Sequence, residues 1–336
     1  MKSLNVLKPG EMAIVERAVP RPGPGEALLR IRYAGICGSD LQTYAGTQPF
    51  ASYPRVPGHE FSAEVVKING DERGFAEGML VTGNPYFNCG NCYSCRRGLI
   101  NCCEHNQTMG VHRDGSFQEY IVMPVDRLHS AEGVDAQVAA MIEPFTIGWH
   151  AMTRAAVGNG HRVIILGAGA IGILAMVAAK VKGAEVFVAD ILPERLNTAI
   201  SMGAAEVYNL RETSIAQAVE AATSGDGFDV VGEATGVPAS FINAVEASAF
   251  GGTVALIGNG SEEVTFNHSQ LIKKELNVVG ARNSLDAFDP LVELLRRDAV
   301  DITPIRTAVH GFEDAVEVME DLSQRPARNI KVLLEF

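Results

Sequence analysis

The 336-residue sequence lacks a long apolar run. Its most apolar uncharged stretch is VIILGAGAIGILAMVAA, residues 163–179, which is shorter than a usual membrane span and contains three glycines. The first residues, MKSLNVLKPGEM, also lack the apolar core of a secretory signal peptide. We therefore expect no membrane partner and a cytoplasmic location.

Positive charge is scarce as well. The chain has 28 Lys and Arg against 40 Asp and Glu, a formal net charge of −12, and no extended Lys/Arg run. A nucleic-acid binder normally presents a basic face, so we expect no nucleic-acid partner. The composition, 47% hydrophobic and 20% charged, is that of an ordinary globular protein. The length predicts about two domains.

The chain contains no tandem repeat and no low-complexity segment, but its texture changes along its length. Residues 1–125 are rich in Gly and Pro and contain short alternating runs such as EALLRIRYAGIC, which predicts a β-rich domain with long loops. From Val163 onward, strand-like and helix-like segments alternate, beginning with RVIIL, AIGILAMVAAKVKG and AEVFVAD. This alternation predicts an α/β domain whose parallel sheet is covered on both faces.

Five of the six cysteines lie in CGNCYSCRRGLINCC, residues 89–103. A disulfide framework is disfavoured without a secretory signal, and the iron–sulfur pattern fails because no Cys-Pro follows Cys95 at the ferredoxin spacing. A closed four-thiolate zinc site remains, formed by Cys89, Cys92, Cys95 and one later cysteine. By geometry alone, either Cys102 or Cys103 could be the fourth ligand.

A second set of candidate ligands is spread along the chain. A catalytic zinc keeps three protein ligands and one open position. Cys37 in AGICGSD, His59 in PGHEF and Glu143 in MIEPF are the candidates. Glu60 is adjacent to His59, and neighbours in an extended segment point to opposite sides, so both residues cannot easily bind one metal at the same time.

Between a predicted strand and a predicted helix lie Gly167, Gly169 and Gly172, in G-x-G-x-x-G spacing. In this context the pattern is typical of a turn that binds a dinucleotide pyrophosphate. Asp190, at the end of the next predicted strand, is expected to bind the adenosine ribose and so to favour NAD over NADP. Arg195 would stack on the adenine or assist a phosphate.

These motifs together resemble the zinc-dependent medium-chain dehydrogenase/reductase family. The spacing C-x2-C-x2-C-x7-C is similar to the structural-zinc lobe of that family, which implies that Cys103 is the fourth ligand. The resemblance also implies that Cys37, His59 and Glu143 bind the catalytic zinc, with Glu60 beside it or as an alternate ligand. The resemblance is strongest to the sorbitol, threonine and sugar-acid (L-galactonate-like) dehydrogenase branch.

The resemblance implies a GroES-like catalytic domain over residues 1–143 and 284–336 and a Rossmann domain over residues 144–283. It also implies two zinc ions per subunit, NAD, a small-molecule substrate and a homo-dimer or homo-tetramer. Zinc would act as a Lewis acid on the substrate oxygen, and the nicotinamide would accept the hydride. Ser39 matches the hydroxyl relay of the family, whereas Gln42 stands where many members carry a histidine.

The substrate is expected to be a polyol or a sugar acid, oxidised at a secondary hydroxyl. Arg282, in VVGARNS, is the candidate to bind a carboxylate, because its guanidinium presents a planar fork of donors. The alternatives are a threonine or simple alcohol dehydrogenase and a non-catalytic NADH- or zinc-binding protein on the same scaffold. Quinone and enoyl reductases of this fold lack the catalytic zinc ligands.

Overall fold

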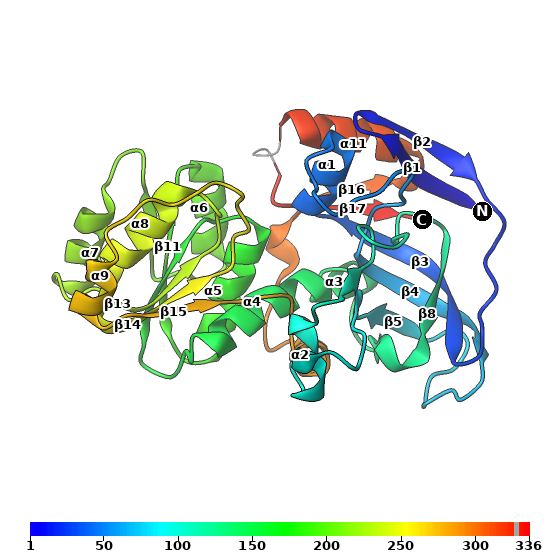
Figure 1. Ribbon diagram of the computed structural model, residues 1–336, viewed down its shortest axis with the longest axis horizontal. Helices are drawn as coiled ribbons and strands as arrows, with labels where there is room; N and C mark the ends of the chain where they lie inside the picture. The colour runs from blue at the N-terminus through cyan, green and yellow to red at the C-terminus, as the bar shows by residue number, and fades with distance from the viewer. Residues whose placement is uncertain (326–328) are drawn as a thin grey trace. The chain divides into compact units, whose positions relative to one another are not determined.

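The computed structural model describes residues 1–325 and 329–336. The chain forms two units, Met1–Glu143 together with Phe288–Phe336, and Pro144–Ala287 (Figure 1). The chain therefore returns to the first unit after completing the second. The boundary suggested by the sequence at 283/284 falls shortly before this return, in the irregular segment that precedes α10 (Phe288–Arg296).

A seven-stranded sheet forms the centre of the first unit. Its strands are β3 (Glu26–Ile36), β4 (Glu60–Asn69), β5 (Leu80–Gly83), β8 (Tyr120–Pro124), β9 (Leu128–Ser130), β16 (Arg306–Gly311) and β17 (Lys331–Glu335). The order is β16-β17-β3-β4-β5-β9, and β8 also pairs with β3. Leu29, Phe61 and Leu334 are fully buried in its core, where each such side chain stabilises the fold by roughly 1.5–3 kcal/mol.

Smaller elements surround this sheet. They are the hairpin β1 (Lys2–Lys8) and β2 (Glu11–Glu16), the pair β6 (Tyr86–Phe87) and β7 (Gln107–Thr108), and the helices α1 (Gly38–Ala45), α2 (Tyr93–Arg96), α3 (Ala136–Ala139), α10 and α11 (Ala315–Gln324). Short 3₁₀ turns lie at Ile100–Cys102, Val125–Arg127, Thr303–Ile305 and Phe312–Asp314. Helix α4 (Ile142–Arg154) begins at the end of the first unit.

A six-stranded parallel sheet forms the second unit. Its order is β12 (Glu206–Asn209), β11 (Glu185–Asp190), β10 (Arg162–Leu166), β13 (Phe228–Glu233), β14 (Ser248–Leu256) and β15 (Asn277–Gly280). Its helices are α5 (Ala170–Val181), α6 (Pro193–Ser201), α7 (Ile215–Thr223), α8 (Pro238–Ala247) and α9 (Ser269–Lys274). The strand order reverses between β10 and β13, which is where doubly wound sheets bind ligands.

Both faces of this parallel sheet are covered, as the alternating texture predicts. Ile164 packs in a buried cluster with Ile215 of α7 and Ala244 of α8. The next residue, Ile165, points to the opposite face, where its Cγ2 would lie 3.4 Å from a Cβ added at Gly172 of α5. The predicted fold class, a GroES-like β-rich domain joined to a doubly wound Rossmann domain, is confirmed.

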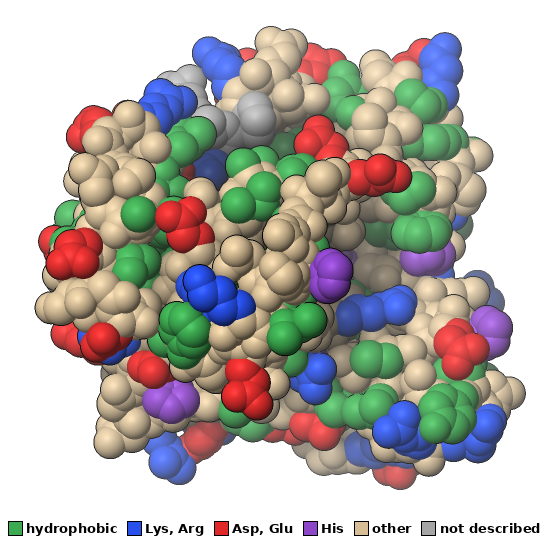
Figure 2. Space-filling view, turned by 60° about the vertical axis from the view of Figure 1, so that its left-hand side comes forward, with side chains coloured by type: hydrophobic (Ala, Val, Ile, Leu, Met, Phe, Trp, Pro, Cys, Tyr) green, Lys and Arg blue, Asp and Glu red, His purple; other side chains and the backbone are tan. Residues whose placement is uncertain are grey.

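The visible face of the molecule carries acidic side chains scattered among basic and apolar ones (Figure 2). This distribution agrees with the net charge of −12. No helix within residues 1–325 and 329–336 combines the length and the apolar character needed to cross a membrane.

Candidate functional site

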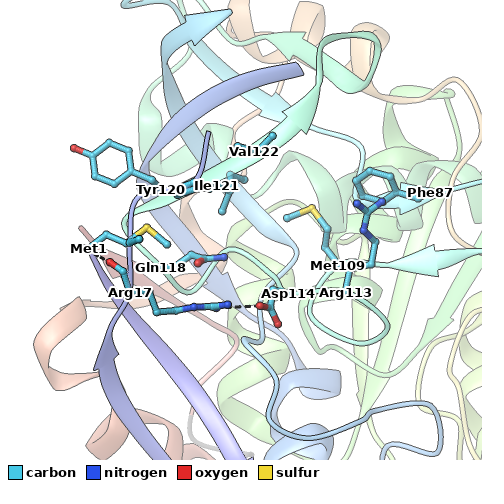
Figure 3. Close-up of a pocket in the computed structure, with 12 residues that line it drawn as sticks. Met1, Arg17, Phe87, Met109, Arg113, Asp114, Gln118, Tyr120, Ile121 and Val122 are labelled. Atoms are coloured by element: carbon cyan, nitrogen blue, oxygen red, sulfur yellow. Dashed lines mark hydrogen bonds and ion pairs between the residues drawn. The ribbon is translucent and has the colours of Figure 1, made fainter. Parts of the chain in front are cut away.

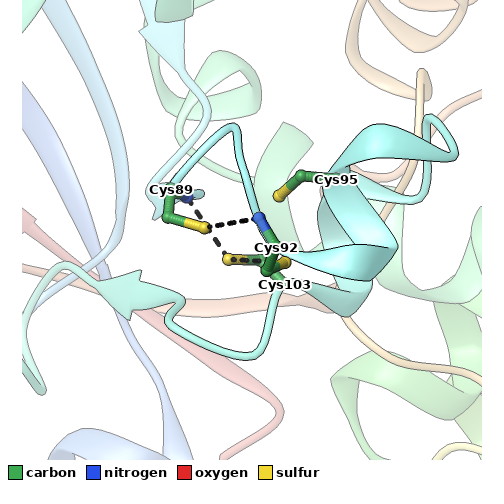
Figure 4. A group of neighbouring side chains, drawn as sticks. All are labelled: Cys89, Cys92, Cys95 and Cys103. Atoms are coloured by element: carbon green, nitrogen blue, oxygen red, sulfur yellow. Dashed lines mark hydrogen bonds between the residues drawn. The ribbon is translucent and has the colours of Figure 1, made fainter.

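The four-cysteine lobe brings together Cys89, Cys92, Cys95 and Cys103, whose sulfur atoms all lie within 4.8 Å of one another (Figure 4). The Sγ atoms of Cys92 and Cys103 are 3.9 Å apart. Thiolates bound tetrahedrally to zinc at about 2.3 Å are about 3.8 Å apart, so the lobe fits a zinc ion. Cys102 ends the 3₁₀ turn Ile100–Cys102 and is not part of this group.

Backbone donors surround these sulfur atoms. The Cys89 and His105 N–H groups donate to Cys103 Sγ at 3.3 Å each. The N–H groups of Cys95 and Glu104 lower the pKa of the Cys92 thiol to about 6, which favours the thiolate that a metal binds. Burial raises the pKa of the Cys103 thiol to about 11, so a nearby cation is needed to keep this sulfur ionised.

The second candidate metal site also lies in the first unit. Ligand atoms of Cys37, His59 and Glu60 lie within 4.8 Å of one another. Cys37 is the N-cap of α1, and His59 directly precedes β4. Glu143 is the second residue of α4 and is buried; it lies outside this three-residue group, although the charges of His59 and Glu60 act on its carboxyl. The structure therefore offers two carboxylates beside one Cys–His pair.

Asp40 joins the two segments that carry Cys37 and His59. Its Oδ2 accepts the Cys37 N–H at 2.9 Å, and its Oδ1 accepts the Gly58 N–H at 2.8 Å. Gly58 has φ +96° and leaves no room for a side chain, because a Cβ would lie 2.4 Å from Phe117 Cδ1. Asp40 belongs to the AGICGSD motif, but no role was predicted for it from the sequence.

His59 carries the strongest sign that a cation belongs at this site. Its Nδ1 is buried and has no hydrogen-bond partner among the described residues; Asp40 Oδ1 is 3.8 Å away, too far for a hydrogen bond. Burial acts to lower the pKa of His59, but Asp40, Cys37 and Glu143 more than offset it and raise that pKa well above its ordinary value. The thiol, the imidazole and the surrounding carboxylates therefore fit a metal cation.

Glu60 forms an ion pair with a lysine that is distant in the sequence. Lys331 Nζ lies 2.7 Å from each carboxylate oxygen of Glu60 and donates to the Ile36 carbonyl at 3.1 Å. Both side chains are buried. Lys331 was not among the residues predicted for the site, although a lysine inside the apolar segment NIKVLLEF is a detectable signal.

Glu143 is held by a tyrosine. The Tyr86 hydroxyl donates a hydrogen bond to Glu143 Oε1. Burial and the Glu143 carboxylate raise the pKa of Tyr86 well above its ordinary value, so the phenol remains a neutral donor. Burial raises the pKa of Glu143 to about 7, whereas a bound cation would favour the ionised carboxylate. No pattern in the sequence points to Tyr86.

Ser39 lies in the first turn of α1, two residues after Cys37, and is half-buried. Its carbonyl accepts the Thr43 hydroxyl at 3.0 Å. Gln42 is on the same helix. The structure thus places Ser39 next to the Cys37 segment, and its part in proton transfer remains a prediction.

The glycine turn lies in the second unit, between β10 and α5. Gly167 follows β10, Gly169 is the N-cap of α5, and Gly172 lies in its first turn. A Cβ at Gly172 would lie 1.8 Å from the Gly167 carbonyl oxygen, so only glycine permits this close approach. The N-terminus of this twelve-residue helix presents free N–H groups suited to a pyrophosphate.

Asp190 ends β11 beside this turn and is buried. Its Oδ2 accepts the Ala168 N–H at 2.6 Å, and its Oδ1 accepts the N–H groups of Ile191 at 2.7 Å and Leu192 at 2.9 Å. Arg195, in α6, lies close to the same turn, since a Cβ at Gly169 would be 3.8 Å from its Nη1. The dinucleotide candidates are therefore brought together.

Arg282 is exposed and follows β15 in the second unit, whereas the candidate metal ligands belong to the first. Its proposed contact with the substrate stays a prediction.

A pocket of about 270 Å³ in the first unit has a different character (Figure 3). It is lined by residues that include Arg17, Phe87 and Asp114, and none of its lining residues is a candidate catalytic or metal-binding residue. Arg17 and Asp114 form an ion pair across it at 3.0 Å. The pocket therefore does not serve as the candidate active site.

Comparisons with known proteins agree with this geometry. Residues 23–133 match the family model of the alcohol dehydrogenase GroES-like domain, and residues 170–297 match that of the zinc-binding dehydrogenases. L-galactonate-5-dehydrogenase from Escherichia coli K12 is 38% identical over 324 residues, 95% of each chain. The solved structure of galactitol-1-phosphate dehydrogenase from Escherichia coli is 29% identical and superposes with a TM-score of 0.93 over 100% of both chains.

A third similar protein is an alcohol dehydrogenase from Escherichia coli CFT073, whose structure was solved with NADH. It is 31% identical and has a TM-score of 0.92 over 100% of this chain and 99% of that one. These matches run along nearly the whole chain and extend through both units. The chain therefore belongs to the zinc-dependent medium-chain alcohol and polyol dehydrogenase family.

Proposed function

We propose that the protein oxidises a secondary hydroxyl group of a polyol or sugar acid and passes the hydride to NAD. One observation carries this proposal: the Cys37–His59 pair, organised by Asp40 and accompanied by two carboxylates, leaves a buried imidazole nitrogen without a partner among the described residues. The names of the similar proteins, a galactonate and a galactitol phosphate dehydrogenase, support the substrate class.

Two sets of residues would hold zinc, so we infer two zinc ions per subunit. The four-cysteine lobe would hold a structural ion, because it supplies a closed set of four thiolates. Cys37, His59 and Glu143 would hold the catalytic ion, with Glu60 beside it. When bound, this zinc supplies Lewis-acid polarisation of the substrate hydroxyl, and NAD supplies the hydride acceptor.

The protein's own residues orient these groups and move the proton. Asp40 fixes the backbone on both sides of the site through Cys37 and Gly58. The Ser39 hydroxyl would accept the substrate proton and pass it on. Because the amide of Gln42 cannot take up a proton at neutral pH, the proton would leave through the cofactor ribose to water.

The cofactor preference would rest on Asp190. Three backbone donors hold its carboxylate at the end of β11, and a carboxylate has about four acceptor positions, so it retains capacity for a ribose hydroxyl. A 2′-phosphate at the same place would meet a like charge. Arg195 beside the glycine turn would contact the adenine or the pyrophosphate.

A homo-oligomer is also part of the proposal. Strand β15 ends the parallel sheet formed by the described residues, and most of its residues are exposed. An exposed sheet edge is a ready template for pairing with another chain, and Val278 on this strand is apolar and 38% exposed. A second copy of the chain at this edge would produce the dimer, or half of a tetramer.

The test is NADH formation by the zinc-replete protein over a panel of polyols, aldonates, threonine and primary alcohols. We expect the highest kcat/KM on a polyol or an aldonate, and loss of turnover with normal NADH binding in the Glu143→Ala variant. Higher kcat/KM on threonine or on primary alcohols would overturn the substrate class. No turnover on any alcohol would favour the non-catalytic alternative.

A further inference from the structure

The hydrogen bond from Tyr86 to Glu143 connects the two candidate metal sites. Tyr86 lies 57 positions before Glu143 in the chain and only three before Cys89. Its side chain therefore reaches a candidate catalytic ligand, while its backbone begins the segment that forms the four-cysteine lobe.

The strand that carries Tyr86 adjoins the lobe. Strand β6, which contains Tyr86, pairs with β7 in the register Tyr86↔Thr108 and Phe87↔Gln107. These two short strands close the base of the loop that carries all four cysteines. A pair of strands with two residues each is only marginally stable on its own. The pairing of β6 with β7 therefore depends on contacts that close the cysteine loop between them. A metal bound by the four thiolates would provide that closure.

Further contacts tie β6 to the lobe and to the sheet. Arg127 donates to the Tyr86 carbonyl at 2.6 Å and to Asn88 Oδ1 at 2.8 Å. The Phe87 ring stacks against the guanidinium groups of Arg113 and Arg127, at 4.0 and 4.7 Å from its centroid. Figure 3 shows Arg113 lying along Phe87. Asn88 Nδ2 in turn lies 3.8 Å from Cys95 Sγ. The contacts form a continuous path from a lobe thiolate to Tyr86.

The bond matters because Glu143 is buried, at 2% exposure. A buried carboxylate that loses a hydrogen-bond donor is free to change its orientation, and a misoriented carboxylate is a weaker metal ligand. Groups that hydrogen-bond a metal ligand typically change metal affinity by about 10- to 100-fold when removed.

We propose that Tyr86 is a positioning residue that orients Glu143 toward the catalytic metal, and that the four-cysteine lobe controls this orientation through β6. The lobe thus acts on the catalytic site as well as on the fold. This inference rests on the two metal sites of the proposed function.

The first test replaces Tyr86 with phenylalanine, which keeps the ring and removes the hydroxyl donor. Cobalt(II) is the probe: the lobe is filled with zinc, cobalt is titrated into the site containing Cys37, and its visible absorption is recorded. We expect Tyr86→Phe to bind cobalt about 10- to 100-fold more weakly and to show an altered cobalt spectrum, with an unchanged melting temperature. The matched control is Tyr33→Phe, which removes a tyrosine–glutamate hydrogen bond on the exposed surface, to Glu335 at 2.9 Å, and should leave cobalt binding as in the wild type.

The second test asks whether the lobe acts through Tyr86. The lobe is disabled by Cys103→Ser, alone and combined with Tyr86→Phe, and cobalt affinity at the Cys37 site is measured again. Emptying the lobe should weaken cobalt binding in the wild type but add little in Tyr86→Phe, since the connection is already broken. Equal weakening in both would overturn the role of Tyr86 in the coupling.

The outcomes separate this inference from the proposed function. A wild type that shows no cobalt–thiolate absorption dependent on Cys37 contradicts both. A wild type with that absorption, and a Tyr86→Phe variant with the same spectrum and affinity, contradicts only the inference.

Discussion

Two adjacent cysteines show how strongly one position decides a side chain's role. Cys103 is fully buried, and its sulfur accepts N–H groups of Cys89 and His105. Cys102, one residue earlier, ends a 3₁₀ turn, is only half-buried and lies outside the thiolate group. The difference follows from the backbone, which leaves the 3₁₀ turn after Cys102: Cys103 is the C-cap of the turn, with φ −55° and ψ 128°.

We predict that Cys103→Ser removes the structural zinc and lowers the melting temperature strongly, because metal binding by such a lobe is coupled to folding. Elemental analysis should find about two zinc ions per subunit in the wild type and about one in Cys103→Ser. Cys102→Ser is the matched control and should keep both ions. If Cys102→Ser loses an ion and Cys103→Ser does not, the assignment of the fourth ligand is wrong.

For individual residues, the spacing of the candidate ligands could be read from the sequence. The side chains that hydrogen-bond those ligands could not. The lobe cysteines and the glycine turn are encoded by short spacings, because their chemistry constrains neighbours along the chain. Tyr86 and Lys331 reach Glu143 and Glu60 only after distant strands pair. Which carboxylate stands nearest the Cys37–His59 pair also depended on folding, since the compact group contains Glu60 and not Glu143.

The C-terminal strand β17 is the element that completes the candidate catalytic site. It pairs antiparallel with β3 through Val332↔Ile36, which places Lys331 beside Glu60 at the start of β4. Its apolar texture predicts a strand. Which strands pair with β17 is decided by contacts between distant parts of the chain, and no local sequence pattern specifies them. The same holds for α4, whose N-terminal turn carries Glu143 and which was not predicted to be a helix.

We predict that Lys331→Met destabilises the protein by roughly 3–5 kcal/mol, because it leaves the buried Glu60 carboxylate without its cation. The double variant Glu60→Gln/Lys331→Met should recover much of that loss, since neither charge is then buried alone. Denaturant unfolding measures both values. Lys2→Met, which breaks the exposed Lys2–Glu313 pair, is the control and should leave stability nearly unchanged. A Lys331→Met variant as stable as that control would contradict the argument.

For the whole molecule, the sequence predicted that the metal motifs and the cofactor motif would belong to different units. A Gly- and Pro-rich β segment and an alternating α/β segment require different layer architectures, and the cofactor motif lies in the second while both metal motifs begin in the first. The tail returns to the first unit because β17 finds its partner there. Substrate choice is the property that these motifs constrain least, because neither the metal motifs nor the cofactor motif specifies the substrate.

The last prediction concerns that choice. Arg282 is an exposed arginine of the second unit, and a guanidinium binds a carboxylate through charge-assisted hydrogen bonds that a neutral polyol cannot supply. Arg282→Ala should therefore raise KM for an aldonate about tenfold or more and raise KM for the matching neutral polyol much less, with kcat nearly unchanged for both. Steady-state kinetics on the two substrates measures this difference.

The control for this prediction is Arg297→Ala, which removes another exposed arginine. Arg297 directly follows α10 and pairs with Glu293 in the last turn of that helix. This variant should leave both KM values as in the wild type, because Arg297 is paired with Glu293 and is not predicted to contact the substrate. If Arg282→Ala raises both KM values equally, Arg282 binds a group common to the two substrates, such as a diol, or acts on the cofactor. A carboxylate would then have to be bound by another cation, and the preference for a sugar acid over a neutral polyol would lose its physical basis.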